Sequence, residues 1–296
     1  MIAQWMHSFV CVADAGSFSL AAQRLGLTQS TVSKQIAALE EHLSARLFQR
    51  TTRSLGLTDE GSAFYEHARL ALAAIDEARA AVGPKTDAQG LLRLTMPLTL
   101  AESRIVPIIA RFMHVHPHIQ IELSISDHPL NLVSDNIDVA IRVGRLVDSS
   151  LVTRKIGTAR RVLVAAPAYL ERAGRPQAVE DLQSHNCLIY SLLSSGPRWR
   201  FASGESVAVS GNFRADSPNA LRTAALAGVG IVANALWLFE NDIASGALEV
   251  VLPDHQPEPM PIQAVLPSGR YIAARTRLFI DYVATELAKD PLCAIA

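Results

Sequence analysis

The stretch SFSLAAQRLGLTQSTVSKQI, residues 17–36, decides the fold of the N-terminal part of the chain. It predicts two short helices joined by a tight turn, the arrangement of a helix-turn-helix. In the first helix Leu20, Ala21 and Leu25 form an apolar stripe, so we expect one buried side. Ser17 stands where a helix N-cap is expected, and Gly26 where a helix ends in the left-handed conformation.

The second helix separates an apolar face from a small polar one. The apolar residues recur at helical spacing, at Val32, Ile36, Leu39 and Leu43. The opposite face starts with Gln29, Ser30, Ser33 and Lys34, and its carboxylates, Glu40 and Glu41, come only farther along. Gln and Ser hydrogen-bond base edges, and Lys reaches a guanine edge or a phosphate. The polar face alone could equally be an ordinary solvated helix surface. The turn that precedes this helix favours instead a recognition helix that binds in the DNA major groove.

Residues 47–58, LFQRTTRSLGLT, predict a β-hairpin with two arginines, several hydroxyls and a glycine at the bend. Such a wing lies along a phosphate backbone or in the minor groove. Residues 1–58 hold five Lys or Arg and three Asp or Glu, a net charge of +2 in a chain whose total is −1. The DNA-binding residues predicted from helix and wing are Thr28, Gln29, Ser30, Thr31, Ser33, Lys34, Arg50, Thr52 and Arg53.

Residues 59–82 predict one long helix whose apolar residues are spaced alternately by four and three, as in a coiled coil. These are Phe64, Ala68, Ala71, Ile75, Ala78 and Val82. A second subunit is the expected partner of this stripe, and packing against the chain's own C-terminal domain is the alternative. A hinge of Gly, Pro and polar residues follows at 83–90. We therefore assign residues 1–58 to a winged helix-turn-helix and 59–90 to a dimerisation helix and hinge.

After the hinge, apolar strands alternate with helices, which predicts parallel α/β sheets. Strands are expected at 91–96, 119–126 and 139–143, with helices near 101–114 and at 273–289. Residues 161–167 open a second subdomain, and 262–267 return the chain to the first. The C-terminal domain, 91–296, should thus have a lobe I (91–160 and 266–296) and a lobe II (161–265) with a hinged cleft between them.

Composition narrows the class of protein. The chain has 296 residues, of which 49% are hydrophobic, enough for two domains with sizeable cores. Cys11, Cys187 and Cys293 lie far apart and lack a Cys-x-x-Cys spacing, so inert thiols and a reducing compartment are expected. The N-terminus lacks the features of a signal peptide, and the apolar runs are too short to span a bilayer. We expect a cytoplasmic protein with no membrane partner.

Taken together, the N-terminal residues resemble the signature of LysR-type transcriptional regulators. The matching residues are Phe9, Val12, Gly16, Ser17, Phe18, Ala21, Ala22, Leu25, Val32, Ser33, Ile36, Leu39, Glu40, Leu47, Phe48, Arg50, Leu57, Thr58 and Gly61. The resemblance extends over essentially the whole chain through residues 138–144, 165–170, 199–201 and 227–231. Two positions depart from the family: Ser44 stands where glycine is usual, and Lys34, which lacks a bidentate fork, stands where arginine is commoner.

The resemblance implies a winged helix-turn-helix, a linker helix and a two-lobed effector domain similar to periplasmic binding proteins. It implies a sequence-specific regulator of transcription, controlled by a small-molecule effector between the lobes, with no enzymatic activity and no cofactor. The implied partners are double-stranded DNA with a pseudo-palindromic site, a second copy in a homodimer or homotetramer, and RNA polymerase. Effector binding would change cleft closure, the orientation of the dimers and DNA bending.

A small anion is expected where strands end and helices begin, and the loop 97–100 fits such a position. The resemblance places this loop in the effector cleft, together with residues from both lobes. The predicted effector-binding residues are Leu98, Thr99, Leu100, Asp127, His128, Arg142, Phe201 and Asp216. Arg142 would clamp a carboxylate or, alternatively, pair with Asp138. His128 departs from the arginine usual there, which weakens the fixed positive charge for an organic anion.

Rival chemistries rest on weaker patterns. Gly228-Val229-Gly230 matches a dinucleotide-binding expression but follows a predicted helix, so the start of a strand is the better interpretation. His114, His116 and His118 lack partners at metal-ligand spacing, so a solvated helix end and no metal are expected. Motifs for catalysis are absent. A redox switch at Cys187 is disfavoured because no second thiol lies nearby in sequence, and Cys293 is placed near a frayed terminus. A constitutive DNA-binding protein with an empty cleft is the runner-up, and an enzyme with a borrowed helix-turn-helix is third.

Overall fold

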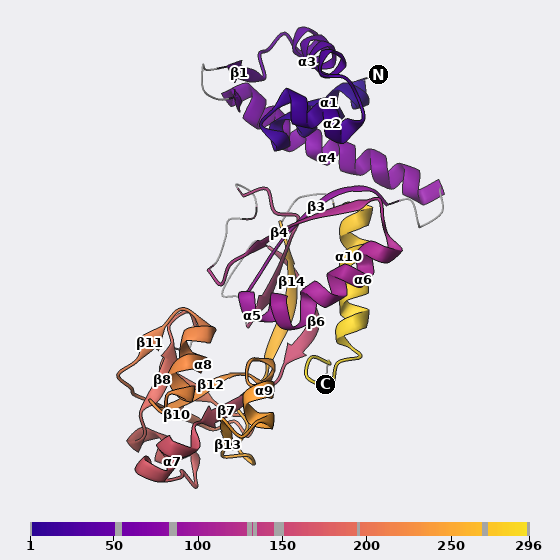
Figure 1. Cartoon of the computed structure of the whole chain (residues 1–296). Coiled ribbons are helices and arrows are strands. Elements are labelled where there is room, and N and C mark those ends of the chain that lie inside the picture. Colours follow the sequence, from indigo (N-terminus) through magenta and orange to yellow (C-terminus); the bar gives the residue numbers. More distant parts are fainter. Residues whose placement is uncertain are drawn as a thin grey trace. The chain divides into compact units, whose positions relative to one another are not determined.

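A computed structural model describes residues 2–50, 55–82, 88–128, 132, 135–144, 151–193, 196–267 and 272–294. The chain forms two compact units, Met1–Ala88 with Gly269–Ala274, and Gln89–Ser268 with Arg275–Ala296 (Figure 1). Within the residues described, no helix is both long enough and apolar enough to cross a membrane.

The first unit contains the predicted helix-turn-helix. Its helices are α1 (Ile2–Ala15), α2 (Phe18–Leu25), α3 (Gln29–Leu43) and α4 (Asp59–Val82). Helix α2 begins at Ser17, whose hydroxyl accepts a hydrogen bond from the Leu20 N–H at 3.4 Å, and ends at Gly26 with φ +64°. Both predicted helix caps are confirmed. Helix α3 begins at Thr28, which accepts from the Thr31 N–H at 3.2 Å, and ends at Ser44 with φ +51°.

The core of this unit follows the apolar stripe of α3. Val32, Ile36 and Leu39 are buried, and Leu43 packs against them, which confirms the face predicted for this helix. The stripe predicted for α2 was partly wrong, because Leu20 is 50% exposed. Ala21 is buried as predicted, and Ala22 is buried in place of Leu20, since small side chains let α2 lie close to its neighbours.

A two-stranded antiparallel hairpin follows α3, as predicted for the wing. Its strands β1 (Phe48–Arg50) and β2 (Leu55–Leu57) pair Phe48 with Leu57. Gly56 lies within β2, opposite Gln49, so its expected place at the bend was wrong. Residues 51–54, which include the predicted DNA contacts Thr52 and Arg53, lie outside the described residues.

The first half of α4 belongs to the core of the helix-turn-helix. The rings of Phe64 and Phe9 lie 5.3 Å apart, and Ala68 is 0% exposed within the same cluster. Ala68 was therefore wrong as a dimerisation residue, because its own chain covers it, whereas Phe64 is half-buried and its dimerisation role stays a prediction. Farther along α4, Ala71 and Ile75 are half-buried and Ala78 is exposed.

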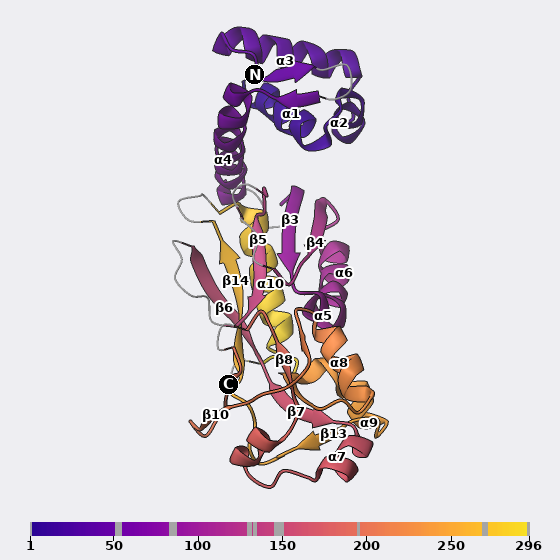
Figure 2. The ribbon, with the colours of Figure 1, turned by 90° about the vertical axis from the view of Figure 1, so that its left-hand side faces the viewer.

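The second unit has two α/β lobes, each built on a five-stranded sheet. The sheet of lobe I has the order β4-β3-β5-β14-β6, seen side by side in Figure 2. Its strands are β3 (Gly90–Met96), β4 (Ile119–Ile125), β5 (Val139–Val143), β6 (Val152–Ala159) and β14 (Met260–Leu266). The helical segments of this lobe are α5 (Leu98–Leu100), a π-helical turn η1 (Ala101–Ile105), α6 (Val106–Val115) and α10 (Ala274–Leu287). Helices α6 and α10 pack through Phe112 and Phe279, whose rings lie 5.3 Å apart.

The sheet of lobe II has the order β11-β8-β12-β7-β13. Its strands are β7 (Arg161–Ala165), β8 (Cys187–Tyr190), β11 (Arg214–Ala215), β12 (Ile231–Ala235) and β13 (Glu249–Val251). A hairpin of β9 (Arg198–Arg200) and β10 (Ser206–Ala208) lies beside it. The helical segments are α7 (Pro167–Ala173), η2 (Val179–Ser184), α8 (Pro218–Leu226), η3 (Leu236–Leu238) and α9 (Glu240–Ala244).

Both sheets are mixed, so the expectation of parallel sheets was right for some strand pairs and wrong for others. In lobe I, β3 runs parallel to β4 and β5, whereas β14 is antiparallel to β5 and β6. In lobe II, β12 is parallel to β8 but antiparallel to β7. Strand β14 is antiparallel to β6 because β6 takes the chain out of lobe I and β14 brings it back at the same end of the sheet, where Met260 pairs with Ala159.

The chain crosses between the lobes twice, after β6 and before β14. Because β14 pairs with lobe I from Met260 onward, the predicted end of lobe II at residue 265 was about five residues too late. The C-terminal turn is fastened to the first crossing, where the Thr158 N–H donates to the Cys293 carbonyl at 2.8 Å. Cys293 is 0% exposed, so its expected place at a frayed terminus was wrong.

Candidate functional sites

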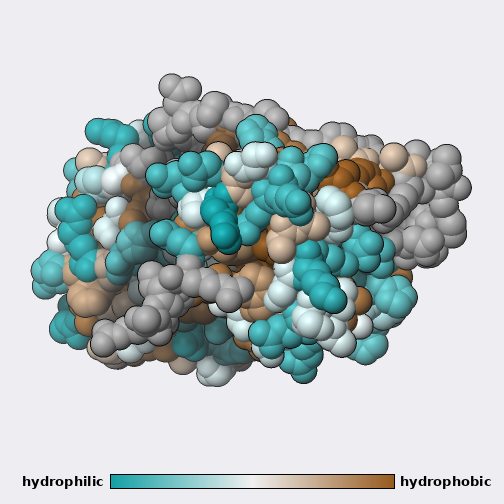
Figure 3. Space-filling model, turned by 90° about the horizontal axis from the view of Figure 1, so that it is seen from above, coloured by the Kyte–Doolittle hydropathy of each residue, from teal (hydrophilic) through white to brown (hydrophobic). Residues whose placement is uncertain are grey.

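The start of α3 presents a polar, exposed surface. Gln29, Ser30 and Lys34 are exposed and Ser33 is half-buried on the side opposite the core. The Thr28 hydroxyl lies 3.0 Å from that of Ser30 and 2.8 Å from that of Thr31. The structure thus brings all six predicted residues of this helix together at its N-terminal end. The space-filling view from above shows hydrophilic and hydrophobic residues intermingled on the surface (Figure 3).

A hollow of about 610 Å³ lies between α3 and the wing. It is lined by Phe18, Ser33, Ile36, Ala37, Glu40, Arg46, Phe48, Gln49 and Thr58. One Glu40 oxygen accepts hydrogen bonds from the N–H groups of Leu47 (2.8 Å) and Phe48 (3.2 Å), and the other lies 3.6 Å from Arg46 Nη1. From the sequence, Glu40 was identified as an acid far from the start of α3 and as a residue of the family signature, but neither Glu40 nor Arg46 was assigned a contact.

In the second unit, titratable side chains from both lobes gather between them. Asp127 and His128 follow β4, Arg142 lies near the end of β5, Tyr190 ends β8, and Asp216 precedes α8. His128 Nε2 lies 3.3 Å from Asp216 Oδ2, which joins the lobes directly. The structure therefore brings together four of the predicted effector residues, and it adds Tyr190, which the sequence did not single out.

Burial sets the direction of the pKa shift at three residues of this cluster, Arg142, Asp127 and Tyr190. Arg142 Nη1 donates to the Ser126 carbonyl at 2.6 Å, while its buried Nη2 has no hydrogen-bond partner among the described residues. Burial lowers the pKa of Arg142, and the nearby Asp127 carboxylate partly offsets this. Burial raises the pKa of Asp127, against the effects of a backbone hydrogen bond from Leu98 and of Arg142. Burial, with help from Asp127 and Asp216, also raises the pKa of Tyr190.

Two predicted effector residues are core residues. Leu100 is 0% exposed and Phe201 is 2% exposed, so their prediction as ligand contacts was wrong. Leu100 follows the polar Thr99 and Phe201 follows the polar Arg200 in sequence, but each packs inward within its own lobe. Leu98 and Thr99 are half-buried at the start of α5. The carboxylate that acts on Arg142 is Asp127, whereas Asp138 accepts a hydrogen bond from the Arg93 N–H at 2.9 Å.

The glycines, histidines and cysteines considered above for nucleotide-binding, metal-binding and redox sites have structural roles. Gly228 to Gly230 connect α8 to β12, as predicted, and a Cβ on Gly230 would lie 2.1 Å from the Asn186 carbonyl oxygen. His116 is buried and its ring packs in a tilted arrangement against that of Phe112, with centroids 4.7 Å apart, so a solvated helix end was wrong for this residue. Among the described residues there is no group of three or more metal-binding side chains. Burial raises the pKa of Cys187 and of Cys293 to about 12, which disfavours reactive thiolates.

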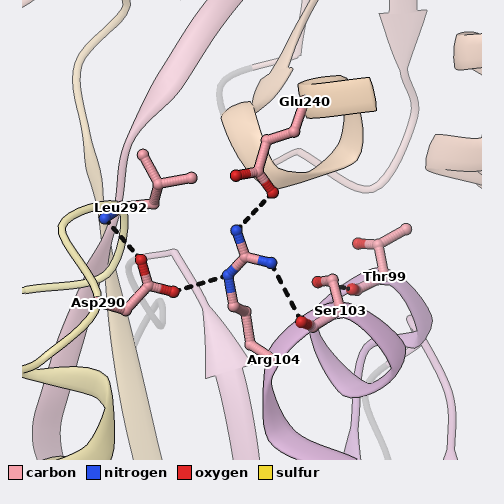
Figure 4. Close-up of polar contacts among 6 residues, drawn as sticks. All are labelled: Thr99, Ser103, Arg104, Glu240, Asp290 and Leu292. Atoms are coloured by element: carbon pink, nitrogen blue, oxygen red, sulfur yellow. Dashed lines mark hydrogen bonds and ion pairs between the residues drawn. The ribbon is translucent and has the colours of Figure 1, made fainter. Parts of the chain in front are cut away.

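A second link between the lobes is centred on Arg104, in the π-helical turn η1 (Figure 4). Its Nη2 donates to Glu240 of α9 at 2.5 Å, and its Nε forms an ion pair with Asp290 at 2.7 Å, although that N–H is not aligned for a hydrogen bond. Burial alone would lower the pKa of Arg104, but the two carboxylates outweigh it and raise the pKa. Sequence reasoning missed this residue, since its partners lie more than 130 positions away.

The fold and these sites define a DNA-binding regulator with a two-lobed ligand-binding domain. Residues 3–62 match the family described as "Bacterial regulatory helix-turn-helix protein, lysR family", and residues 85–288 match "LysR substrate binding domain". The HTH-type transcriptional regulator CrgA of Neisseria meningitidis is 35% identical over 291 residues, 96% of each chain. A regulator of Xanthomonas campestris is 34% identical over 290 residues, 95% of this chain and 84% of that protein.

Solved structures of LysR-type regulators are similar to this chain over nearly its whole length. The CrgA structure covers 96% of this chain and 98% of its own at 35% identity, with a TM-score of 0.59. Full-length AphB of Vibrio cholerae covers 95% of this chain and 98% of its own at 30% identity, with a TM-score of 0.56. The chain belongs to the LysR family of transcriptional regulators: it has a helix-turn-helix DNA-binding domain and a substrate-binding effector domain, and it is not an enzyme.

Proposed function

We propose that α3 enters the major groove of a pseudo-palindromic operator and that Gln29, Ser30, Ser33 and Lys34 contact base edges there. Thr28, Thr31, Arg50, Thr52 and Arg53 would contact the phosphate backbone. The observation that supports this proposal is the polar, exposed N-terminal end of α3 above a buried Val32-Ile36-Leu39 stripe. A helix anchored in this way can present its first turns to a groove without losing its core.

The effector would be a small organic anion bound between the lobes. Arg142 supports this proposal, because one of its guanidinium nitrogens is buried and has no hydrogen-bond partner among the described residues. A ligand carboxylate would supply that partner. Leu98, Thr99, Asp127, His128 and Asp216 would surround it, and binding would change how the lobes close.

The protein would act in the cytoplasm as a homodimer or homotetramer and would contact RNA polymerase at its promoters. The exposed or half-buried part of α4, at Ala71, Ile75 and Ala78, supports a helix-to-helix contact between subunits. Its small side chains allow close approach of a second helix.

Footprinting on the DNA upstream of the protein's own gene, with random DNA in excess, tests the proposal. A protected, dyad-symmetric site is expected. Gln29→Ala and Ser33→Ala should each lower discrimination between this site and random DNA by about 1–3 kcal/mol per lost base contact. Ser203→Ala, at an exposed position of lobe II, is the matched control. Unchanged sequence preference in both α3 variants would refute the assignment of α3 as the reader.

A further inference from the structure

The hollow between α3 and the wing adjoins the surface proposed to read DNA. Ser33 belongs to both, and Ala37, one turn farther along the exposed side of α3, forms part of its wall. The opposite wall comes from Arg46, Phe48 and Gln49, at the start of the wing. A DNA strand bound against the first turns of α3 would therefore extend into this hollow.

The rim of the hollow offers positive charge. The Arg46 side chain is 86% exposed, and its Nη1 lies 3.6 Å from Glu40, a loose contact for an ion pair. Exposed pairs of this kind are weak, so Arg46 can exchange its partner at little cost. Glu40, by contrast, is 14% exposed and is held by the N–H groups of Leu47 and Phe48. The carboxylate is fixed below the rim while the guanidinium is free to turn outward.

The floor of the hollow is apolar. Phe18, Ile36 and Phe48 contribute to it, and the methyl group of Ala37 leaves room on an exposed face of α3. A free phosphate or a carboxylate would gain nothing from such a floor, and an apolar peptide would gain nothing from the arginine. A deoxyribose joined to a phosphate has both an apolar ring face and a charged end, so it matches floor and rim together.

We propose that the hollow receives the sugar–phosphate backbone of one operator strand, with a phosphate bound by Arg46 in place of Glu40 and a deoxyribose lying over Ala37. This inference rests on the proposed DNA-binding function and adds a residue to it. The backbone strand would pass between the major groove, occupied by α3, and the wing. Glu40 would hold Arg46 near its binding position before DNA arrives.

Arg46→Ala tests the charged half of the proposal. Loss of one phosphate contact lowers the slope of log affinity against log salt by about 0.9 for each bound subunit. By the same relation affinity should fall, for each bound subunit, about 5-fold at 0.15 M salt and about 15-fold at 0.05 M, so about 30-fold and about 220-fold for a dimer, equally for operator and random DNA. Arg214→Ala removes the same charge from an exposed position on β11 and should leave both quantities unchanged.

Ala37→Leu tests the apolar half. Leucine preserves helix propensity and charge but fills the hollow. Operator affinity should fall at least tenfold, while thermal unfolding of the variant stays like that of the wild type. Wild-type affinity in this variant would overturn the proposal, because an occupied hollow cannot accept the larger side chain.

Ethylation interference locates the contact on the DNA. Ethylating one phosphate in each half-site should block the wild type, and the same ethylation should have no further effect on Arg46→Ala. Specific operator binding together with identical salt slopes and interference patterns in Arg46→Ala and Arg214→Ala would overturn this inference and leave the proposed function standing. Failure of the wild type to prefer any sequence would overturn both.

Discussion

Replacing Arg104 by alanine should destabilise the effector domain, because this half-buried side chain pairs with Asp290 in its own lobe and with Glu240 in the other lobe. The Arg104 side chain is 18% exposed, and its partners Asp290 and Glu240 are 24% and 40% exposed. The more buried pair with Asp290 should contribute about 1–2 kcal/mol, and the more solvated pair with Glu240 about 0.5–1 kcal/mol. With the lost packing of its aliphatic stem, the expected loss is about 2–3 kcal/mol.

The assay is thermal unfolding of the full-length protein at fixed salt and protein concentration. For a unit of about 200 residues, this loss lowers Tm by about 4–12 °C. Arg111→Ala is the matched control: Arg111 binds Glu286 at 2.7 Å, but its side chain is 54% exposed and its partner lies in the same lobe. The control should lose less than about 1 kcal/mol. A Tm for Arg104→Ala equal to that of Arg111→Ala would refute the reasoning that a partly buried arginine with a partner in each lobe stabilises the domain more than an exposed pair within one lobe.

Three further outcomes follow from the structure. Gly61→Ala should lose about 2–3 kcal/mol of unfolding free energy, because its Cβ would lie 2.0 Å from the Leu47 carbonyl oxygen. Gly56→Ala is the control, since its Cβ would meet only a side-chain atom at 3.9 Å. Equal urea midpoints for the two variants would contradict this prediction. Burial lowers the pKa of His116 and of His185 below 6.5, so the unfolded chain binds protons at a higher pH than the folded chain does. The free energy of unfolding measured at pH 7.5 should therefore decline as the pH falls below about 6.5. Urea unfolding of His116→Gln should show a smaller decline than the wild type. Iodoacetamide at pH 8 should modify Cys187 and Cys293 only after urea is added, because burial raises each pKa to about 12; mass spectrometry showing rapid modification of the native protein would disprove their burial.

Local signals in the sequence predicted the helices and caps of the N-terminal unit. The caps at Ser17 and Gly26 depend on neighbours within four residues, so residue type alone identifies them. The placement of Leu20 depended on tertiary packing: helical spacing allowed it to face the core, but the smaller Ala22 does so. Phe64 and Ala68 fit a coiled-coil spacing equally well, and only the position of α1 decides that they pack within their own chain.

In the effector domain, the sequence predicted two lobes but few of their cleft residues. Leu100 and Phe201 stand next to polar residues, and sequence does not reveal which way each side chain points. Tyr190 and Arg104 were missed because their partners come from distant segments that meet only in the folded chain. The direction of β14 was missed for the same reason, since strand direction depends on where the chain re-enters the sheet.

The packing of α4 determines which fragment of this protein can be studied alone. A fragment ending at Thr58, where the wing ends, would lack Phe64, Tyr65 and Ala68 and would expose Phe9 and Val12 to water. We expect such a fragment to aggregate. A fragment that continues beyond Ala73 would keep these contacts and should fold. The minimal DNA-binding module therefore includes the first half of α4 as well as the winged helix-turn-helix, because that half of the helix is part of the module's core.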